Sequence, residues 1–361
     1  MSETRLGVDV GGTFTDLVAL SDGTLVTAKV PSTPRDQSEG VMNAVRTSEV
    51  EPGAVSALAH GMTVATNALL ERRGARIALV TTEGFRDVLE IARQNRASLY
   101  DLAADRPPPL VPRELRFTVT ERMGPEGEIL PLDDESLKAA VSAVEEAEVE
   151  AVAVCLLFAF AHPEHEERVG EALRETLPDV HVSLSSEVLP EFREYERFST
   201  TAADAYLAPR LAAYLKNLAG KAEESGVPPP LIMQSSGGVA RIDDAIEDAA
   251  GCVLSGPAGG VVGAAYVGAL GGYQDLLTFD MGGTSTDVAP IIGGEAQTTT
   301  ETVVAGVPIK LPMVDVHTVS AGGGSVAWAD AGGALRVGPH SAGAEPGPAG
   351  YGMGGEEPAV T

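Results

Sequence analysis

Short apolar runs alternate with amphipathic segments along the N-terminal half of the chain, and this alternation predicts an α/β fold. Apolar runs of strand length occupy residues 6–10, 17–20 and 24–30, whereas residues 37–47 have the spacing of a helix. The run of eleven apolar residues at 151–161 is too short to cross a bilayer and suits a central strand. We therefore expect strands and helices packed in layers.

One eight-residue pattern, Asp-x-Gly-Gly-Thr-x-Thr-Asp, occurs at residues 9–16 and again at residues 280–287. Each copy lies between two apolar runs, so each is expected to form a β-hairpin with a Gly-Gly turn. Agreement at six positions disfavours coincidence, although two ordinary glycine-rich hairpins remain the alternative.

The chemistry of these hairpins suits the triphosphate of a nucleotide. Glycine lets backbone N–H groups approach an anion, threonine hydroxyls bind phosphate oxygens, and a leading carboxylate can hold Mg²⁺ through water. We predict ATP and Mg²⁺ as cofactors, with Asp9 and Asp280 as the catalytic and metal-binding residues. The predicted nucleotide-binding residues of the hairpins are Gly11, Gly12, Thr13, Thr15, Asp16, Gly282, Gly283, Thr284, Thr286 and Asp287.

The paired hairpins resemble those of the actin-like ATPase superfamily, in which ATP lies between two duplicated domains. The resemblance implies an actin-like ATPase (ribonuclease H-like) fold with duplicated α/β domains, the second of which is incomplete. The sequence contains neither a G-x-x-x-x-G-K-[ST] loop nor a G-x-G-x-x-G turn that opens a helix after a strand.

Residues 255–270, just before the second hairpin, have a stripe of small residues. Gly256, Gly260, Ala264 and Gly268 would share one helical face. Each glycine inside a helix destabilises it by about 1 kcal/mol relative to alanine, so a stripe of glycines has to be explained by some other benefit. Close packing of a second helix against this face would be such a benefit. The alternative is a flexible glycine-rich loop.

A glycine triplet follows a strand-like stretch near the C-terminus. A backbone without side chains can lie flat against a planar base or a phosphate, so we assign the triplet to nucleotide binding. It comprises Gly322, Gly323 and Gly324.

Two polar stretches have competing interpretations. His60, Thr63 and Asn67 lie at an expected strand-to-helix junction, where they either cap the helix or contact a ligand. The His-x-x-His spacing of His162 and His165 would allow both side chains to bind one metal ion, but the glutamates around them favour a solvated helix end.

The chain is similar to the hydantoinase A / 5-oxoprolinase family over nearly its whole length. It differs from the family at Met62, Asp204 and Gly350, where the family more often has Thr, Asn and Cys. The similarity rests on residues 60–71, 81–87, 190–201, 314–325 and 338–355.

The resemblance divides the chain near residue 188. Residues 1–188 would form the N-terminal hydantoinase/oxoprolinase domain with the first hairpin. Residues 189–361 would form the N-terminal part of the hydantoinase A domain, with the connecting helix and the second hairpin. Because family members are several hundred residues longer, we expect a chain that is truncated relative to them.

The resemblance also implies an activity. The γ-phosphate of ATP would pass to the carbonyl oxygen of a lactam or hydantoin, and water would then open the ring, with help from a hydantoinase B-type partner subunit. The alternatives are the ATP-using subunit of an acetone-type carboxylase and a non-catalytic, nucleotide-gated clamp.

The composition limits which binding partners and which cellular compartment are expected for the protein. The 361 residues include 52 acidic and 25 basic side chains, a net charge of −27, which disfavours sequence-independent binding of nucleic acid, so no nucleic-acid partner is expected. Such an acidic, lysine-poor composition suits concentrated salt and suggests a halophile. The absence of a signal peptide, a convincing membrane segment and a C-x-x-C pair predicts a cytoplasmic protein, which we expect to be an oligomer.

Overall fold

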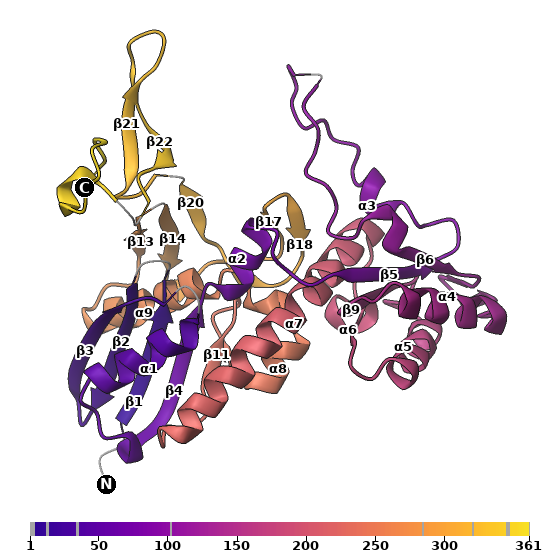
Figure 1. The fold of residues 1–361 in the computed structure, drawn as a ribbon, viewed down its shortest axis with the longest axis horizontal. Helices are drawn as coiled ribbons and strands as arrows, with labels where there is room; N and C mark the ends of the chain where they lie inside the picture. The colour runs from indigo at the N-terminus through magenta and orange to yellow at the C-terminus, as the bar shows by residue number, and fades with distance from the viewer. Residues whose placement is uncertain are drawn as a thin grey trace.

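The computed structural model describes residues 4–11, 14–33, 36–101, 103–283, 285–319, 321–343 and 347–360. Two α/β lobes are joined by one long helix, and a β-rich part lies beside the first lobe (Figure 1). Within the described ranges, no helix has the length and apolar character needed to cross a bilayer.

The first sheet carries the first hairpin and has the strand order β12-β11-β4-β1-β2-β3. Strands β1, β2 and β3 pair antiparallel, whereas β4 runs parallel to both β1 and β11. Alternation along β1 and β2 buries one face under helices α1 and α7 and leaves the other face exposed among the described residues. The bounds are β1 (Thr4–Val10), β2 (Phe14–Ser21), β3 (Thr24–Pro31), β4 (Val55–Met62), β11 (Leu231–Met233), β12 (Val239–Ala240), α1 (Gln37–Thr47) and α7 (Glu194–Glu224).

The second lobe is built on a parallel sheet with the order β10-β9-β5-β6. Its central strand β9 is buried along its whole length, as expected for a strand covered on both faces. The chain leaves this strand at Cys155, so the predicted strand of eleven residues is in fact five residues long. The bounds are β5 (Ile77–Thr82), β6 (Arg116–Val119), β7 (Arg122–Gly124), β8 (Gly127–Leu130), β9 (Ala151–Cys155), β10 (His181–Leu184), α3 (Val88–Ile91), α4 (Asp134–Glu146), α5 (Glu164–Thr176) and α6 (Ser185–Val188).

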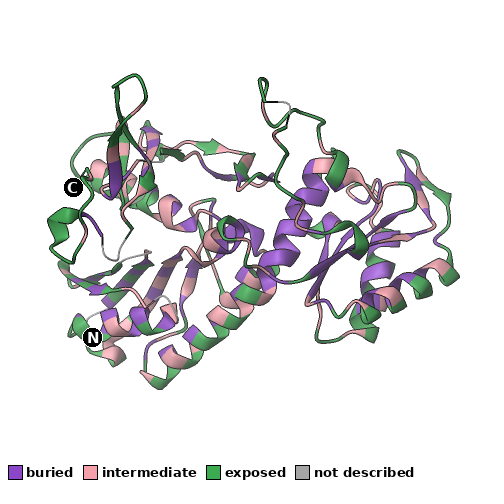
Figure 2. Ribbon diagram, turned by 45° about the horizontal axis from the view of Figure 1, so that its top comes forward, coloured by how far each residue is buried: buried purple, intermediate pink, exposed green. Residues whose placement is uncertain are grey.

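Helix α7 belongs to both lobes. Its N-terminal half is buried on almost every side against the second lobe, whereas its C-terminal half buries a narrower face, with Leu218 and Ala222 in the core of the first sheet (Figure 2). After this helix, β11 returns to pair with β4 of the first sheet. The boundary near residue 188 therefore divides the sequence but not the lobes, because the first sheet takes strands from both sides of it.

The β-rich part carries the second hairpin. Its sheet has the order β13-β14-β15, with β20 also paired to β14, and helix α9 packs against it (Figure 1). The remaining bounds are α2 (Val64–Leu70), α8 (Ile242–Glu247), α9 (Ser255–Leu270), β13 (Leu276–Met281), β14 (Thr286–Ile292), β15 (Glu295–Ala296), β16 (Thr298–Thr299), β17 (Thr302–Val304), β18 (Val307–Ile309), β19 (Met313–Val314), β20 (His317–Val319), β21 (Ser325–Ala329) and β22 (Leu335–Ser341).

Residues 255–270 form the expected helix, but the small residues of its stripe have separate surroundings. A Cβ at Gly256 would lie 3.4 Å from Asp9 Oδ1, and one at Gly268 would collide with the Leu276 side chain. A Cβ at Gly260 would meet no described atom within 4 Å. Close packing therefore explains Gly256 and Gly268, and no second helix covers Gly260 in the part of the chain that the structure describes.

We expect Gly260→Ala to stabilise the protein by about 0.5–1 kcal/mol, because alanine is the better helix former and its methyl group has room. Urea unfolding of both proteins measures the difference. Gly268→Ala is the matched control, since its new Cβ would collide with Leu276 Cδ1 and the substitution should not stabilise. A clear loss of stability in Gly260→Ala would show that another segment packs on this face.

Candidate functional site

The two hairpins have the same local geometry. Asp9 pairs with Asp16 across β1 and β2, and Asp280 pairs with Asp287 across β13 and β14. The turns match as well, because Gly11 N–H donates to the Phe14 carbonyl (3.0 Å) and Gly282 N–H donates to the Ser285 carbonyl (2.9 Å). The duplicated pattern thus forms duplicated hairpins; Gly12, Thr13 and Thr284 of their turns lie outside the described residues.

Asp9 lies where the first sheet, α9 and the second hairpin meet. Its Oδ1 would be 2.8 Å from a Cβ at Gly61 and 3.4 Å from one at Gly256, so glycine at both positions makes room for the carboxylate. Burial, and then the charges of Asp16 and Asp280, raise the pKa of Asp9 above its usual value. The negative charge of Asp280 in the second hairpin therefore disfavours a charge on Asp9 in the first.

This repulsion would be relieved by a cation between the carboxylates. The described residues hold no cluster of three or more His, Cys, Asp or Glu side chains suited to a metal ion. A site with one or two carboxylates fits Mg²⁺, which keeps several waters and takes further ligands from phosphates. Asp9 and Asp280 are the residues that would hold it.

Sequence reasoning missed a lysine beside the first hairpin. Lys29 on β3 pairs in register with Asp16, and its Nζ contacts both carboxylate oxygens, at 2.6 and 2.7 Å. The same ammonium lies 5.0 Å from the centre of the Phe14 ring. The register of the β2–β3 hairpin is the signal that could have found this pair, because directly opposed residues share a face.

The second threonine of each pattern lies inside the protein. Thr15 is fully buried, with its hydroxyl 3.1 Å from that of Ser32, and Thr286 donates to the Ala321 carbonyl at 2.6 Å. Asp287 instead is only partly buried, and its carboxylate accepts a hydrogen bond from Thr318 at 2.6 Å. The expectation that the Thr15 and Thr286 hydroxyls bind phosphate does not suit these positions, where both groups hold the hairpins together.

The glycine triplet packs on the second turn. Gly323 N–H donates to the Gly282 carbonyl (2.9 Å) and Gly324 N–H donates to the Gly283 carbonyl (2.7 Å). A Cβ at Gly322 would lie 2.6 Å from the Gly282 carbonyl oxygen, closer than real Cβ atoms come. Glycine is needed here because one backbone lies directly on another, a reason additional to the contact with a base or a phosphate that we expected.

His60 has a structural role. Its ring is fully buried, with Nδ1 3.2 Å from the Val8 carbonyl and Nε2 2.7 Å from the Tyr214 hydroxyl. Burial lowers the pKa of His60 to about 4, so the ring is neutral near pH 7, donates to Val8 and accepts from Tyr214. His60 therefore joins β1, β4 and α7 beneath the hairpin.

The free energy of unfolding should fall as the pH drops from about 6.5 to about 4. In this range His60 is protonated in the unfolded chain but stays neutral in the folded protein, so protonation favours the unfolded state. The contribution of His60 amounts to at most about 3.5 kcal/mol, taking about 1.4 kcal/mol per pH unit. His60→Gln should show a flatter dependence of unfolding free energy on pH, measured with urea between pH 4 and 7. His162→Gln, at a less buried histidine, is the control, and parallel curves for wild type and His60→Gln would contradict this account.

Thr63 and Asn67 form a short chain of hydrogen bonds. Thr63 Oγ1 donates to the Val10 carbonyl (3.3 Å) and accepts from Asn67 Nδ2 (3.2 Å). Thr63 is the residue before α2, yet its side chain makes no capping hydrogen bond to that helix. These groups therefore tie α2 to the first hairpin, and the Asn67 amide oxygen stays available.

The His-x-x-His pair is neither a metal site nor a solvated helix end. His165 is buried, with Nδ1 2.9 Å from a Glu121 oxygen and Nε2 3.0 Å from a Glu128 oxygen. His162 Nε2 lies 3.3 Å from the Pro125 carbonyl. Both side chains hold the β7–β8 hairpin, and the prediction of a solvated end was wrong for His165 because those glutamates come from a distant part of the sequence.

Two cavities flank helix α2. The first-hairpin cavity, about 690 Å³, lies between Gly11, the start of α1, α2 and α7. The second-hairpin cavity, about 770 Å³, is lined by the turn residues Gly282 and Gly283 together with Gly324. Asn67 of α2 lines both cavities, and each has the size of a small-molecule site.

Comparison with known proteins places this geometry in a family. The hydantoinase/oxoprolinase N-terminal region matches residues 5–177, and the hydantoinase/oxoprolinase domain matches residues 197–361. The crystal structure of the ATP-dependent caprolactamase from Pseudomonas jessenii is similar, with a TM-score of 0.85, 38% identity, and coverage of 99% of this chain and 54% of that one. This likeness confirms the expected actin-like ATPase type of fold.

Two further relatives carry different names. 5-Oxoprolinase 1 of Arabidopsis thaliana is 39% identical over an alignment of 392 positions that covers 98% of this chain and 30% of the relative. The acetophenone carboxylase gamma subunit of Aromatoleum aromaticum is 35% identical over an alignment of 381 positions that covers 99% of this chain and 52% of the relative. The chain spans about half or less of the relatives it matches, and it belongs to the hydantoinase/oxoprolinase family.

Proposed function

We propose that the protein transfers the γ-phosphate of ATP to the carbonyl oxygen of a cyclic amide, as a subunit or part of an ATP-dependent hydrolase. The observation that carries the proposal is the matched pair of hairpins, in which the negative charge of Asp280 on the second acts on the leading carboxylate of the first, Asp9. A triphosphate held between two such turns would contact backbone from both sides, which is how positioned dipoles assist phosphoryl transfer.

Different residues of this chain would bind the phosphates, hold the metal ion and supply a nearby positive charge. The backbone of the turns at Gly11–Gly12 and Gly282–Gly283 would bind phosphate oxygens, joined by the hydroxyls of Thr13 and Thr284. Asp9 and Asp280 would hold Mg²⁺, which neutralises phosphate charge when bound. Lys29, already beside Asp16, brings a further positive charge to the side of the first hairpin.

Phosphorylation makes an unreactive amide open to water. The carbonyl oxygen attacks the γ-phosphorus, the bond from that phosphorus to the β–γ bridging oxygen breaks, and ADP leaves with the electron pair. Loss of the amide proton gives an O-phosphorylated imidate, whose carbon then accepts water. Breakage of the C–N bond then leaves the ring-opened amine with an acyl phosphate. A second water hydrolyses this acyl phosphate to the carboxylate and free phosphate, so the whole sequence consumes two water molecules per ATP.

Measuring ATP hydrolysis with and without an acceptor tests the proposal. We expect ε-caprolactam, 5-oxoproline or hydantoin to raise the rate of ADP formation several-fold and to appear as ring-opened product. The carboxylase alternative, which the gamma-subunit relative favours, predicts a response to ketones instead. A nucleotide-gated clamp predicts no response to any small carbonyl compound.

A partner subunit is part of the proposal. The caprolactamase and carboxylase relatives are named as subunits, and we propose a hydantoinase B-type chain as the partner here. Large exposed apolar side chains on α9, and on the face of β13 that points away from α9, support association. They are Tyr266, Val267, Leu270, Leu277 and Phe279.

We place the enzyme in the cytoplasm of a halophile, since Cys155 and Cys252 are both buried free thiols and the chain carries a charge of −27. Raising KCl from 0.1 to 1 M shortens the Debye length from about 10 Å to about 3 Å and should raise the thermal unfolding midpoint by several degrees. A neutral osmolyte at equal osmolality controls for solvent exclusion. A midpoint that falls with KCl would argue against adaptation to salt.

A further inference from the structure

The first-hairpin cavity is nearly free of net charge in a strongly acidic protein. Its charged lining residues are Asp36, Glu71, Arg73 and Arg210, two of each sign. Glu71 pairs with Arg73 at 3.0 Å, and Arg210 pairs with Glu150 at 3.1 Å. An uncharged polar molecule suits such a cavity better than an anion such as ATP, whose charge would find its cations already paired.

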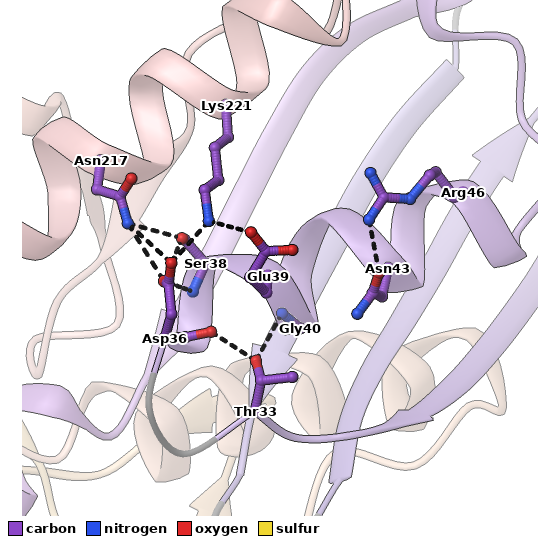
Figure 3. A network of polar contacts seen from close by, with 9 residues as sticks. All are labelled: Thr33, Asp36, Ser38, Glu39, Gly40, Asn43, Arg46, Asn217 and Lys221. Atoms are coloured by element: carbon purple, nitrogen blue, oxygen red, sulfur yellow. Dashed lines mark hydrogen bonds and ion pairs between the residues drawn. The ribbon is translucent and has the colours of Figure 1, made fainter.

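Asp36 and α7 fix one wall of this cavity. The Asp36 side chain caps α1 by accepting from Ser38 N–H (3.1 Å), and it also accepts from Lys221 Nζ (2.7 Å) and Asn217 Nδ2 (3.2 Å), as Figure 3 shows. Although burial opposes the shift, hydrogen bonds from Lys221, Ser38 and Asn217 lower the pKa of Asp36 to about 2. The ionised carboxylate therefore orients the Asn217 amide, with its nitrogen toward Asp36.

Amide oxygens on the cavity wall are left as acceptors. Since Asn217 Nδ2 donates to Asp36, its Oδ1 is turned away from that carboxylate. Asn67 is oriented in the same manner, because Thr63 Oγ1 already donates to Val10 and must accept from Asn67 Nδ2. Gln37 Oε1 is buried without a hydrogen-bond partner among the described residues. Such acceptors call for a ligand with N–H donors.

We propose that this cavity binds the acceptor of the phosphoryl group, and that the acceptor is an uncharged cyclic amide with at least one N–H group. The inference rests on the proposed function and decides between its two enzymatic forms. A ketone has a carbonyl oxygen but no N–H, so it would leave the asparagine oxygens unpaired. A neutral lactam or hydantoin satisfies them, whereas 5-oxoproline brings a carboxylate for which the cavity's arginines are already paired, so it should be the poorest of the three acceptors named above.

Asn67 is the positioning residue, because it lines both cavities. In a small lactam ring the amide is held cis, so its N–H and C=O point to the same side. An N–H that donates to Asn67 Oδ1 therefore places the carbonyl oxygen next to Asn67, at the boundary with the second-hairpin cavity. That boundary is where the γ-phosphate of a nucleotide held by Gly282 and Gly283 would arrive.

Binding of lactam probes without nucleotide tests the site separately from the chemistry. We expect calorimetric titration to show ε-caprolactam binding, with N-methylcaprolactam and cyclohexanone at least tenfold weaker, since neither presents an N–H. Asn67→Ala and Asn217→Ala should each weaken caprolactam binding at least tenfold, and Asn217→Ala, at a residue that does not line the second-hairpin cavity, should leave Mg²⁺-ATP affinity within twofold. Asn43→Ala, which removes an asparagine of α1 outside the cavity, is the matched control and should bind as wild type does.

Each outcome decides one of the two proposals. Equal binding of N-methylcaprolactam, or unchanged caprolactam affinity in both folded asparagine variants, overturns the assignment of this cavity. If caprolactam then still stimulates ATP hydrolysis, the proposed function stands and the acceptor binds elsewhere. If caprolactam binds with the expected dependence on Asn67 and Asn217 but never stimulates ATP hydrolysis, the site stands and the proposed function fails. Thermal unfolding of both variants identifies any loss of fold beforehand.

Discussion

Replacing Asp280 with alanine is expected to weaken Mg²⁺-dependent ATP binding more than tenfold, which corresponds to about 1.4 kcal/mol. Asp280 leads the second hairpin, and its charge reaches Asp9, whose pKa it helps to raise. Without Asp280, a cation between the hairpins loses one of its two anionic neighbours. Asp9→Ala should have an effect of similar size, because the hairpins are matched in register.

Titrating ATP with and without Mg²⁺ separates the metal from the nucleotide. Both aspartate variants should lose the gain in affinity that Mg²⁺ provides, whereas binding of metal-free ATP should change little or improve as repulsion falls. Asp243→Ala, on the exposed side of α8, changes the net charge equally and should bind as wild type does. Unchanged affinity in the double variant Asp9→Ala, Asp280→Ala would remove both hairpins from the nucleotide site.

The hairpins could be predicted from sequence because every determinant is local. A strand, a Gly-Gly turn and a second strand fix their own register, so Asp9 opposite Asp16 follows from the pattern itself. The repeat at Asp280 then predicts the second copy. The same holds for α9, where the composition of residues 255–270 allowed either helix or loop, and their regular spacing favoured the helix that is observed.

What the sequence could not predict depends on residues brought together by the fold. The glycines that surround Asp9 come from β4 and α9, 52 and 247 positions further along the chain. Lys29 reaches Asp16 only through the register of β2 and β3. His165 resembled a solvated residue because its partners, Glu121 and Glu128, precede it by about forty positions.

The division into lobes is the largest difference between sequence order and structure. A boundary drawn near residue 188 assumes that each half of the chain folds by itself. Instead β11 completes the first sheet, and α7 contributes to both cores. Parallel pairing of β4 with β11 requires a long crossover, here containing the whole second lobe, and local patterns carry no signal for such a connection.

Replacing Gly322 with alanine is expected to destabilise the protein by up to about 3 kcal/mol and to disturb the second turn. The new Cβ would lie 2.6 Å from the Gly282 carbonyl oxygen and 2.7 Å from both the Gly283 carbonyl carbon and the Ser285 nitrogen. All three are backbone atoms of the turn, so no flexible side chain can move aside. Either the triplet or the turn has to shift.

The shift would reach the nucleotide through hydrogen bonds. Gly323 and Gly324 donate to the carbonyls of Gly282 and Gly283, so a displaced triplet releases the backbone that we propose for phosphate binding. Gly322→Ala should therefore weaken ATP binding by tenfold or more in protein that remains folded, measured by titration below its unfolding midpoint. Gly7→Ala adds the same methyl group on β1 where no described atom lies within 4 Å, and both stability and affinity should stay near wild type. Wild-type stability and affinity in Gly322→Ala would mean that the triplet does not support the turn as the structure shows.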